Sequence, residues 1–325
     1  ILETGRNQQY SLSVNGGGET ARYFLAGRYA NINGPIGAER WGPAQDFDES
    51  YNFSSSLTLF ALEDLRVRIT SNYTHRFHET MENNNNIFGV LTKTTDSNPV
   101  SAWSGNPTGS NTFVTVPEAM QRQTFQETDH YTGSANLNFS PTGVLTLDAT
   151  FGADFVGSQS TTDVPFGWNV DDFTTFNVDG LRNHNKTARL EISSDVKGTV
   201  STDLTDDLTS DLVLGGQLFV SEQKEALVSG EQFPGPGLEV TNAAALQSTF
   251  ESRLEEVSGG VFAQEQVGYR DWIFLTLGAR LDKHSAFGEA AGAEFYPKAS
   301  FSVVPSDWDN WNSDLVSTLR VRGAF

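Results

Sequence analysis

Apolar and polar residues alternate with a period of two along much of this 325-residue chain. Between Leu145 and Phe155 every odd position is apolar, whereas the even positions carry two Thr, one Gly and two Asp. A helix cannot separate residues in this way, but a strand can, because its successive side chains point to opposite faces. The same alternation recurs at 131–139 and at 65–73. The pattern predicts long amphipathic β-strands.

Twelve such strands can be placed by this criterion. Several of them exceed the roughly 5–6 residues of a typical strand in a soluble protein. They match instead the roughly 9–11 residues with which a tilted strand crosses a bilayer. The expected ranges are 8–14, 22–32, 51–61, 65–75, 130–139, 144–156, 187–201, 208–222, 254–268, 272–283, 292–304 and 314–325.

The connections between these strands alternate in length. Short ones are expected at 15–20, 62–64, 140–143, 205–207 and 269–271, with a slightly longer one at 305–313. Long polar ones are expected at about 33–50, 76–129, 157–186 and 223–253, with a shorter one at 284–291. Short turns at one rim and long loops at the other are typical of an outer-membrane barrel, with the short turns in the periplasm and the long loops outside the cell. A soluble β-sandwich also alternates, but nothing forces its long loops to one end.

Composition removes several classes of protein. The chain has 41 acidic and 21 basic side chains, a net charge of −20 and no cysteine. This charge argues against a nucleic-acid partner, and the absence of cysteine excludes disulfides and a thiol nucleophile. No apolar run approaches the roughly 18–20 residues of a spanning helix, which excludes a helical membrane protein but not a barrel. The first residues lack both a signal peptide and an initiator Met, so we expect a processed or truncated chain.

Motifs for catalysis or cofactor binding have simpler explanations here. Gly16-x-Gly18-x-x-Ala21 matches a dinucleotide fingerprint, but the residues that follow are strand-like and not helical, so we interpret it as a hairpin turn. His75 and His78, with two nearby glutamates, lack the HExxH arrangement and are interpreted as ordinary residues near the rim. No G-x-S-x-G motif occurs. We expect no catalytic residue, no metal site and no cofactor.

Two features do suggest binding. Aromatic residues are spaced through the long loops beside carboxylates and amides, a combination that suits sugars. The same rings could pack the loops together or form the interfacial aromatic belt, and both interpretations stay open. The second feature is charge on the expected lumen face, which is tolerable in water or against an internal plug. The charged residues expected there are Arg66, Arg68, Asp148, Asp154, Arg189, Glu191, Arg280, Asp282, Arg320 and Arg322. Leu145, Leu147, Phe151 and Phe155 are expected to face lipid. The candidate substrate-binding residues are Trp41, Trp103, Phe166, Trp168, Arg66 and Arg68.

A family resemblance lies in the last part of the sequence. Residues 259–282 read GGVFAQEQVGYRDWIFLTLGARLD, and 296–300 read YPKAS. These segments resemble the barrel of SusC/RagA-type TonB-dependent outer-membrane transporters, in which a Gly-Gly-aromatic-x-Gln-Glu-Gln strand, a short turn and a Gly-x-Arg-x-Asp strand precede a Tyr-Pro-Lys-Ala-Ser strand. The resemblance is specific across about 255–325 and moderate at 5–32.

The resemblance implies a 22-stranded barrel with an N-terminal plug inside it. It also implies energy from TonB through that plug, a SusD-like lipoprotein lid over the outer mouth, and oligosaccharides or peptides as cargo. We therefore expect residues 1–325 to be an all-β, partial transmembrane barrel in outer-membrane lipid, without a plug and with exposed first and last strands. The alternative is a complete, passive twelve-stranded porin or adhesin-like barrel, which the terminal aromatic residue Phe325 favours.

Overall fold

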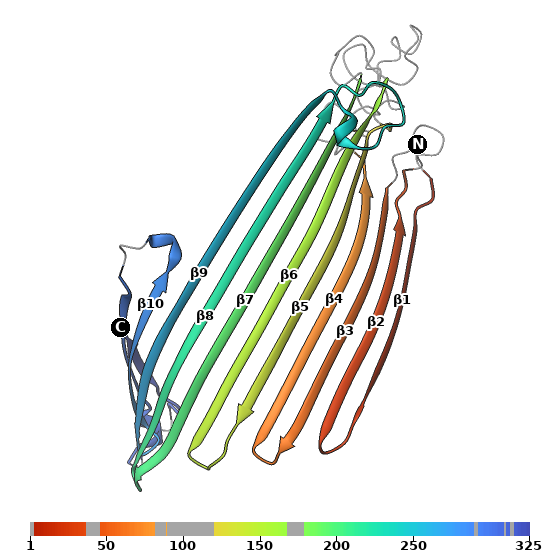
Figure 1. The fold of residues 1–325 in the computed structure, drawn as a ribbon. Coiled ribbons are helices and arrows are strands. Elements are labelled where there is room, and N and C mark those ends of the chain that lie inside the picture. The colour runs from red at the N-terminus through yellow and green to blue at the C-terminus, as the bar shows by residue number, and fades with distance from the viewer. Residues whose placement is uncertain are drawn as a thin grey trace.

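The computed structural model describes residues 3–36, 46–81, 89, 120–167, 179–288, 292–308, 310–312 and 315–325. In these residues twelve strands form one antiparallel sheet, in which each strand lies beside its neighbours in the sequence (Figure 1). All twelve predicted strands are therefore present. Their bounds are β1 Arg6–Gly17, β2 Ala21–Asn33, β3 Phe47–Leu62, β4 Leu65–Thr80, β5 Gln123–Phe139, β6 Leu145–Phe166, β7 Asp179–Thr205, β8 Leu208–Glu231, β9 Leu246–Tyr269, β10 Ile273–His284, β11 Glu294–Val303 and β12 Val321–Ala324.

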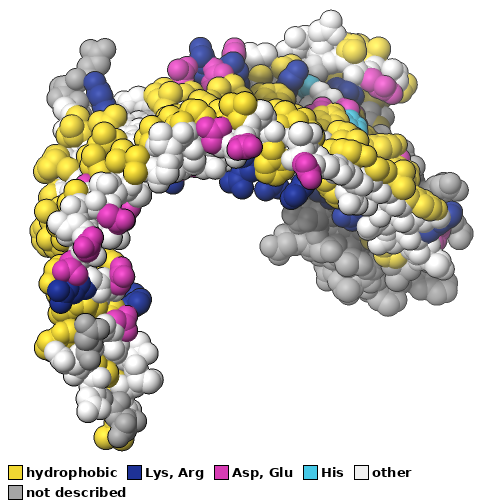
Figure 2. Space-filling view, turned by 90° about the horizontal axis from the view of Figure 1, so that it is seen from below, with side chains coloured by type: hydrophobic (Ala, Val, Ile, Leu, Met, Phe, Trp, Pro, Cys, Tyr) yellow, Lys and Arg dark blue, Asp and Glu magenta, His cyan; other side chains and the backbone are white. Residues whose placement is uncertain are grey.

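The sheet is an open arch. Within the described residues β1 pairs only with β2, and β12 pairs only with β11. Figure 2, seen from below, shows the arch with a wide gap between its two ends. The predicted open sheet is confirmed, and the twelve-stranded closed barrel of the alternative interpretation is not formed.

The first hairpin shows why the glycines of the apparent dinucleotide motif form a turn. β1 ends at Gly17, whose φ of 145° lies in the region that favours glycine. A Cβ atom there would stand 2.3 Å from the carbonyl oxygen of Ala21. The Gly18 amide then donates a hydrogen bond to that same oxygen, at 2.8 Å, and closes the turn. The hairpin interpretation is therefore confirmed.

Several strands extend further toward the long loops than predicted. β7 has 27 residues where 187–201 was expected, and β9 begins at Leu246 where 254 was expected. The long connections are correspondingly shorter, at 34–46, 81–122, 167–178 and 232–245. In these extensions both faces of the strand carry many polar side chains, so the apolar alternation that marks an amphipathic strand is lost.

The last strand is the one clear error in the predicted elements. A strand was expected over 314–325, but β12 contains only Val321–Ala324. Before it, a short 3-10 turn begins at Pro305, and the Trp308 ring stacks on Trp272 with centroids 5.9 Å apart. The Trp311 indole donates a hydrogen bond of 3.0 Å to the carbonyl of Val316. These local contacts hold the connection in an irregular path, which a pattern of period two cannot reveal.

The two faces of the sheet differ in chemistry. We call the outer side of the arch the convex face and the inner side the concave face. Leu147, Phe151 and Phe155 follow one another along β6 on the convex face and expose 38%, 53% and 41% of their area. The register places Phe151 beside Ala135 of β5 and Ser194 of β7, and Figure 2 shows hydrophobic side chains along this outer side. Large exposed apolar surfaces mark contact with lipid or another protein.

A single curved layer has little interior. Among the described residues few apolar side chains are buried, and two of them, Met120 and Val164, lie toward the long-loop end. None of the described helical segments has the length and hydropathy to cross a membrane. The concave face, which a barrel lumen would enclose, is therefore the surface considered for a site.

Candidate binding face on the concave side

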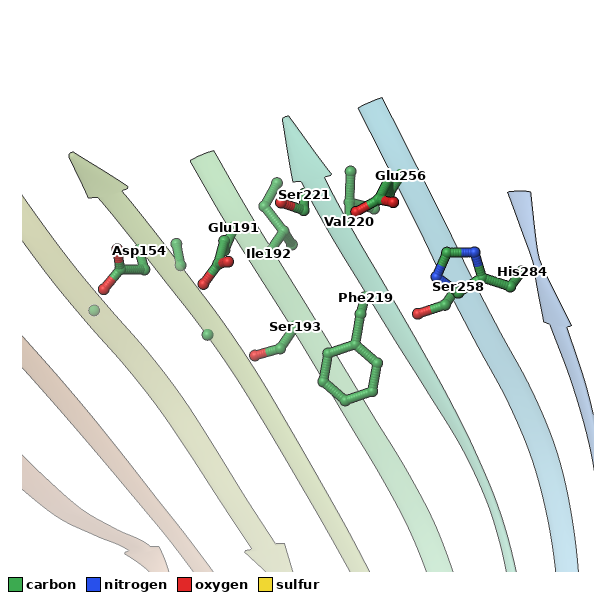
Figure 3. A pocket seen from close by; sticks show the side chains of 13 residues that line it. Asp154, Glu191, Ile192, Ser193, Phe219, Val220, Ser221, Glu256, Ser258 and His284 are labelled. Carbon is green, nitrogen blue, oxygen red and sulfur yellow. The ribbon is translucent and has the colours of Figure 1, made fainter. Parts of the chain in front are cut away.

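A cavity of about 430 Å³ lies on the concave face between β6 and β10. Two cross-strand rows form it. The register aligns Asp154, Glu191, Ser221 and Glu256 in one row. Figure 3 shows these side chains together with those of the second row. The second row runs through Gly152, Ser193, Phe219, Ser258 and His284.

The cavity owes part of its depth to a missing side chain. A Cβ atom on Gly152 would stand 2.6 Å from the Ser193 hydroxyl oxygen, so any larger residue would displace that hydroxyl. The cavity wall then offers a phenyl ring from Phe219 and several hydroxyl and carboxylate oxygens. This combination can accept hydrogen bonds from a polar solute while a ring covers one of its less polar faces.

Hydrogen bonds fix the two histidines of this region. His130 Nε2 lies 3.0 Å from the Asp154 carboxylate. His284 Nδ1 accepts a hydrogen bond of 3.0 Å from the Ala286 amide, so the neutral imidazole carries its proton on Nε2. The His284 ring also packs on Phe287, with centroids 5.5 Å apart. Both rings are therefore held in place at the edge of the cavity.

A second polar cluster extends across four adjacent strands, β7 to β10, below the cavity. Arg280 of β10 donates to the carboxylate of Asp282 at 2.7 Å and to the side chain of Gln217 of β8 at 2.6 Å. Gln217 in turn donates to Asp195 of β7 at 2.5 Å. The guanidinium reaches over β9 because the residue between Gln217 and Asp282 is Gly260. We call these residues the arginine network.

The predicted residues Arg66 and Arg68 lie near the short-turn end of the concave face. Their even positions in β4 place them in the rows of Asn138 and Asn136 of β5. A third arginine, Arg22 of β2, lies on this face and packs over the Phe60 ring at 5.3 Å. Their position on the concave face directs both side chains toward the open side of the arch. Among the described residues neither Arg66 nor Arg68 forms an ion pair.

The predicted residue Phe166 lies at the opposite end of the sheet. It is the last residue of β6 and exposes 38% of its area. Asp148, in the row of Arg66, lies 18 residues earlier on the same strand, which corresponds to roughly 60 Å at about 3.3 Å per residue. The structure therefore does not bring Phe166 and the two arginines together. Trp41, Trp103 and Trp168 lie outside the described residues.

Near Phe166 an ion pair secures the long-loop end. Arg182 Nη1 donates to both carboxylate oxygens of Asp163, at 3.0 and 2.9 Å. Burial raises the pKa of Asp163, and the attraction of Arg182 offsets only part of that effect. Phe233 is 6% exposed and covers Gly180, whose φ is 85°. This end is thus well packed even though it lies beyond the part of the sheet whose convex face carries the exposed apolar side chains.

The histidines considered as metal ligands point to different faces. His75 is in the row of Tyr51 and places Nδ1 3.0 Å from Asp129, whereas His78 is in the row of Asp48. Because these rows differ by an odd number of residues, the two rings lie on opposite sides of β4. The described part of the chain contains no group of three or more His, Cys, Asp or Glu side chains that could hold a metal.

Sequence reasoning placed Asp154 and Glu191 on the inner face but missed Phe219, Glu256 and His284. Period two alone gives the face on which each residue lies. It does not give the residue's level, that is, which residues of the neighbouring strands lie opposite it. The levels follow from the short turns, because each turn fixes which residues of the two strands lie opposite one another. Counting outward from the turn at 270–272 would have aligned Ser258 with His284. The pairing of Phe219 with Ser258 could not be found in this way, because β8 and β9 are joined by the long connection 232–245.

The open curved sheet, with an apolar convex face and a polar concave face, defines a portion of a β-barrel wall. Residues 80–322 match the family described as TonB dependent receptor-like, beta-barrel. The chain therefore belongs to the TonB-dependent receptor-like β-barrel family. A comparison with curated protein sequences gave no match.

Solved structures share the fold. "Structure of the RagAB peptide transporter" has a TM-score of 0.76 at 16% identity and covers 98% of this chain and 36% of the other. The outer membrane transporter YddB from Escherichia coli has a TM-score of 0.55 at 11% identity, with 92% and 36% covered. The open form of the ferric-catecholate import receptor Fiu from E. coli K12 has a TM-score of 0.52 at 12% identity, with 98% and 49% covered. The chain thus spans between about a third and a half of these relatives.

Proposed function

We propose that this chain forms part of the wall of a closed outer-membrane barrel, which imports oligosaccharides or peptides with energy from TonB and carries out no catalysis. The observation that carries the proposal is the division of one curved sheet into an apolar convex and a polar concave face, in a chain of this family. The apolar convex face would contact lipid, and water in the barrel lumen would solvate the polar concave face. The whole barrel would have 22 strands, of which the described residues of this chain supply twelve.

The different lengths of the connections at the two rims support one orientation in the membrane. The long connections would face the outside of the cell and the short turns the periplasm, as in other barrels of this kind. Cargo would be captured by loop aromatics, pass along the polar lumen and be released when an internal plug rearranges. Trp41, Trp103, Phe166 and Trp168 are the proposed capture residues, and Arg66 and Arg68 the proposed lumen contacts.

The proposed partners are a SusD-like lipoprotein lid over the outer mouth and the TonB complex, reached through the plug. The likeness to a protein titled a peptide transporter supports peptides as one cargo class. Aromatic residues that stand beside carboxylates and amides in the sequence of the long loops support oligosaccharides as the other. Ser258 lies beside His284, but Nδ1 of this imidazole accepts from the Ala286 amide and Nε2 carries its proton, so the ring has no free nitrogen to act as a base for Ser258, which supports the absence of catalysis.

Uptake by whole cells tests the proposal. Cells that lack the gene and cells that carry it on a plasmid are given fluorescent peptides or oligosaccharides, with and without a protonophore. We expect accumulation that needs both the gene and the proton gradient. Gene-dependent entry that persists with the protonophore would contradict the TonB-driven mechanism and support a passive pore.

Capture can be tested separately by calorimetry on the full-length protein. If the cargo is a glycan, Trp103→Ala and Trp168→Ala should each weaken binding by about 1 kcal/mol, by analogy with other aromatic contacts. Unchanged affinity in a folded variant would assign these rings to loop packing.

A further inference from the structure

The upper part of β9 has a free edge. β10 ends at His284, which pairs with Ser258, and the 3-10 turn Ser285–Phe287 that follows lies beside β9 just above that pair. Above this turn, Leu246–Glu256 of β9 pair as a strand only with β8 within the described chain. Figure 1 shows β9 extending far above the end of β10. This stretch has eleven residues and spans about 36 Å at roughly 3.3 Å per residue.

Backbone groups of every second residue point to this edge. The Val257 amide donates to the Ser285 hydroxyl at 2.8 Å, so it points to the β10 side. Because backbone groups alternate in direction along a strand, the amides and carbonyls of Glu251, Arg253 and Glu255 point the same way. No described backbone or side chain bonds to them there. Such a row is a template for another strand.

An apolar stripe accompanies the free edge. Leu246, Phe250 and Leu254 expose 52%, 55% and 57% of their area. They occupy even positions and therefore share the concave face with Glu256 of the cavity. Natural edge strands are usually protected by proline, by bulges or by charged side chains, lysine above all. This stretch has no proline, no lysine and no register shift against β8, and its charges are three carboxylates and one arginine.

The convex side of the same edge is acidic. Arg253 is already engaged, since it donates to Glu222 at 2.7 Å and to Glu255 at 2.9 Å. Glu251 forms no ion pair among the described residues. A strand beside this edge would therefore meet apolar groups on one face and carboxylates on the other. The matching strand alternates apolar residues with basic ones.

We propose that the free edge of β9 is a docking site for an extended segment of another protein, which adds to the sheet as a strand. Its apolar residues pack beside Phe250 and Leu254, and its basic residues lie beside Glu251 and Glu255. A second copy of this chain does not fit the antiparallel arrangement, because the required twofold axis is perpendicular to the sheet and would invert one copy in the membrane. Main-chain hydrogen bonds give such docking its affinity, and the side-chain pattern gives its specificity.

The test uses the purified full-length protein and a fluorescent nine-residue peptide that alternates valine with lysine. The control is the same peptide methylated on every second amide nitrogen, which removes the amide donors along one edge of the peptide and so blocks strand pairing there. We expect fluorescence anisotropy to show at least about tenfold weaker binding of the methylated peptide, or roughly 1.4 kcal/mol. Equal binding of the two peptides would overturn the proposal.

A matched pair of variants locates the site. Glu251→Pro removes the amide that points to the free edge and leaves the pairing with β8, whereas Glu251→Ala keeps that amide. We expect the proline variant to bind the valine–lysine peptide about tenfold more weakly and the alanine variant less than about threefold. If the proline variant does not fold, the methylated peptide still decides the question.

Hydrogen exchange provides the second measurement. The amides of Glu251, Arg253 and Glu255 should exchange rapidly in the free protein and slow down when the peptide is bound. Slow exchange without the peptide would mean that another part of the protein already covers the edge, and would overturn the proposal. None of these measurements uses transport, so their failure is distinct from a failure of the proposed import function.

Discussion

Gly260 of β9 lies directly against the side chain of Asp282 of β10: a Cβ atom at Gly260 would stand 1.8 Å from the Asp282 carboxylate oxygen and 2.8 Å from the Leu281 carbonyl oxygen. Neither atom can yield easily, since one is fixed by Arg280 and the other belongs to the backbone. The arginine network therefore depends on a residue that contributes no side chain.

Gly260→Ala should destabilise the protein because the added methyl group displaces Asp282 and breaks the contact that orients Arg280. We expect a loss of about 1–3 kcal/mol, as for other overpacked positions. Urea-induced unfolding of the reconstituted barrel measures it. Gly216→Ala is the matched control, since a Cβ atom there would meet its nearest neighbours at 3.6 and 3.7 Å, which is ordinary contact. Equal stability of the two variants would contradict this account.

Phe151→Arg and Thr150→Arg should differ strongly, because adjacent residues of β6 point to opposite faces. An arginine at 151 would enter lipid, at a cost of about 2–4 kcal/mol near the bilayer midplane, whereas one at 150 would enter the wet lumen. Folding yield in lipid vesicles, read from heat-dependent gel mobility, tests the difference. The opposite order would mean that the two faces have been exchanged.

Asp207→Asn should make stability less dependent on pH in the acid range. Arg270 donates hydrogen bonds of 2.9 and 3.1 Å to Asp207 across two turns, and these bonds lower the pKa of that carboxyl. A lowered pKa in the folded state contributes stability above the unfolded value of about 3.9, and the contribution disappears as pH falls through the folded value. The difference in unfolding midpoint between wild type and variant should therefore be present at pH 7 and vanish in acid.

The adjacent residue supplies the control for this experiment. Asp206 lies in the same turn and forms no ion pair among the described residues. Asp206→Asn should leave the pH dependence of the midpoint unchanged. A change as large as that of Asp207→Asn would show that the general charge of the turn matters, and not the pair with Arg270.

Trp308→Ala should loosen the irregular connection before β12. The ring of Trp308 stacks on Trp272 at an interplanar angle of 17°, and such a pair contributes about 0.5–1.5 kcal/mol beyond its buried area. We expect faster amide exchange in β12, because its four residues have few other contacts. Trp311→Ala removes a different contact, and the two variants together would separate stacking from hydrogen bonding.

The sequence predicted the number of strands, their order and their faces, because period two is a direct consequence of strand geometry. Leu147 and Asp148 were assigned to their faces without any knowledge of the rest of the sheet. The ends of the strands were less accessible. Toward the long-loop end, stretches such as 179–186 carry polar residues on both faces, and a strand stabilised only by its backbone hydrogen bonds leaves no mark in the pattern.

The candidate site was predicted in part for a related reason. The alternation placed Asp154, Glu191 and Arg280 on the inner face, where they lie. It could not show that Gln217 would reach Arg280, because that contact depends on register and on the empty space at Gly260. The free edge of β9 was likewise hidden, since it arises from the different heights of two neighbouring hairpins.

The length of β7 has a consequence for how a solute first meets the cell surface. A strand of 27 residues is about 90 Å long at roughly 3.3 Å per residue, and at a tilt of about 45° it rises roughly 63 Å along the bilayer normal. The apolar band of such barrels is only about 25 Å tall. In the proposed orientation, the remaining height stands as a collar among the sugar chains of the outer leaflet. A diffusing molecule would then touch the collar before it touches lipid, so the target area of the proposed transporter would be larger than the footprint of its pore.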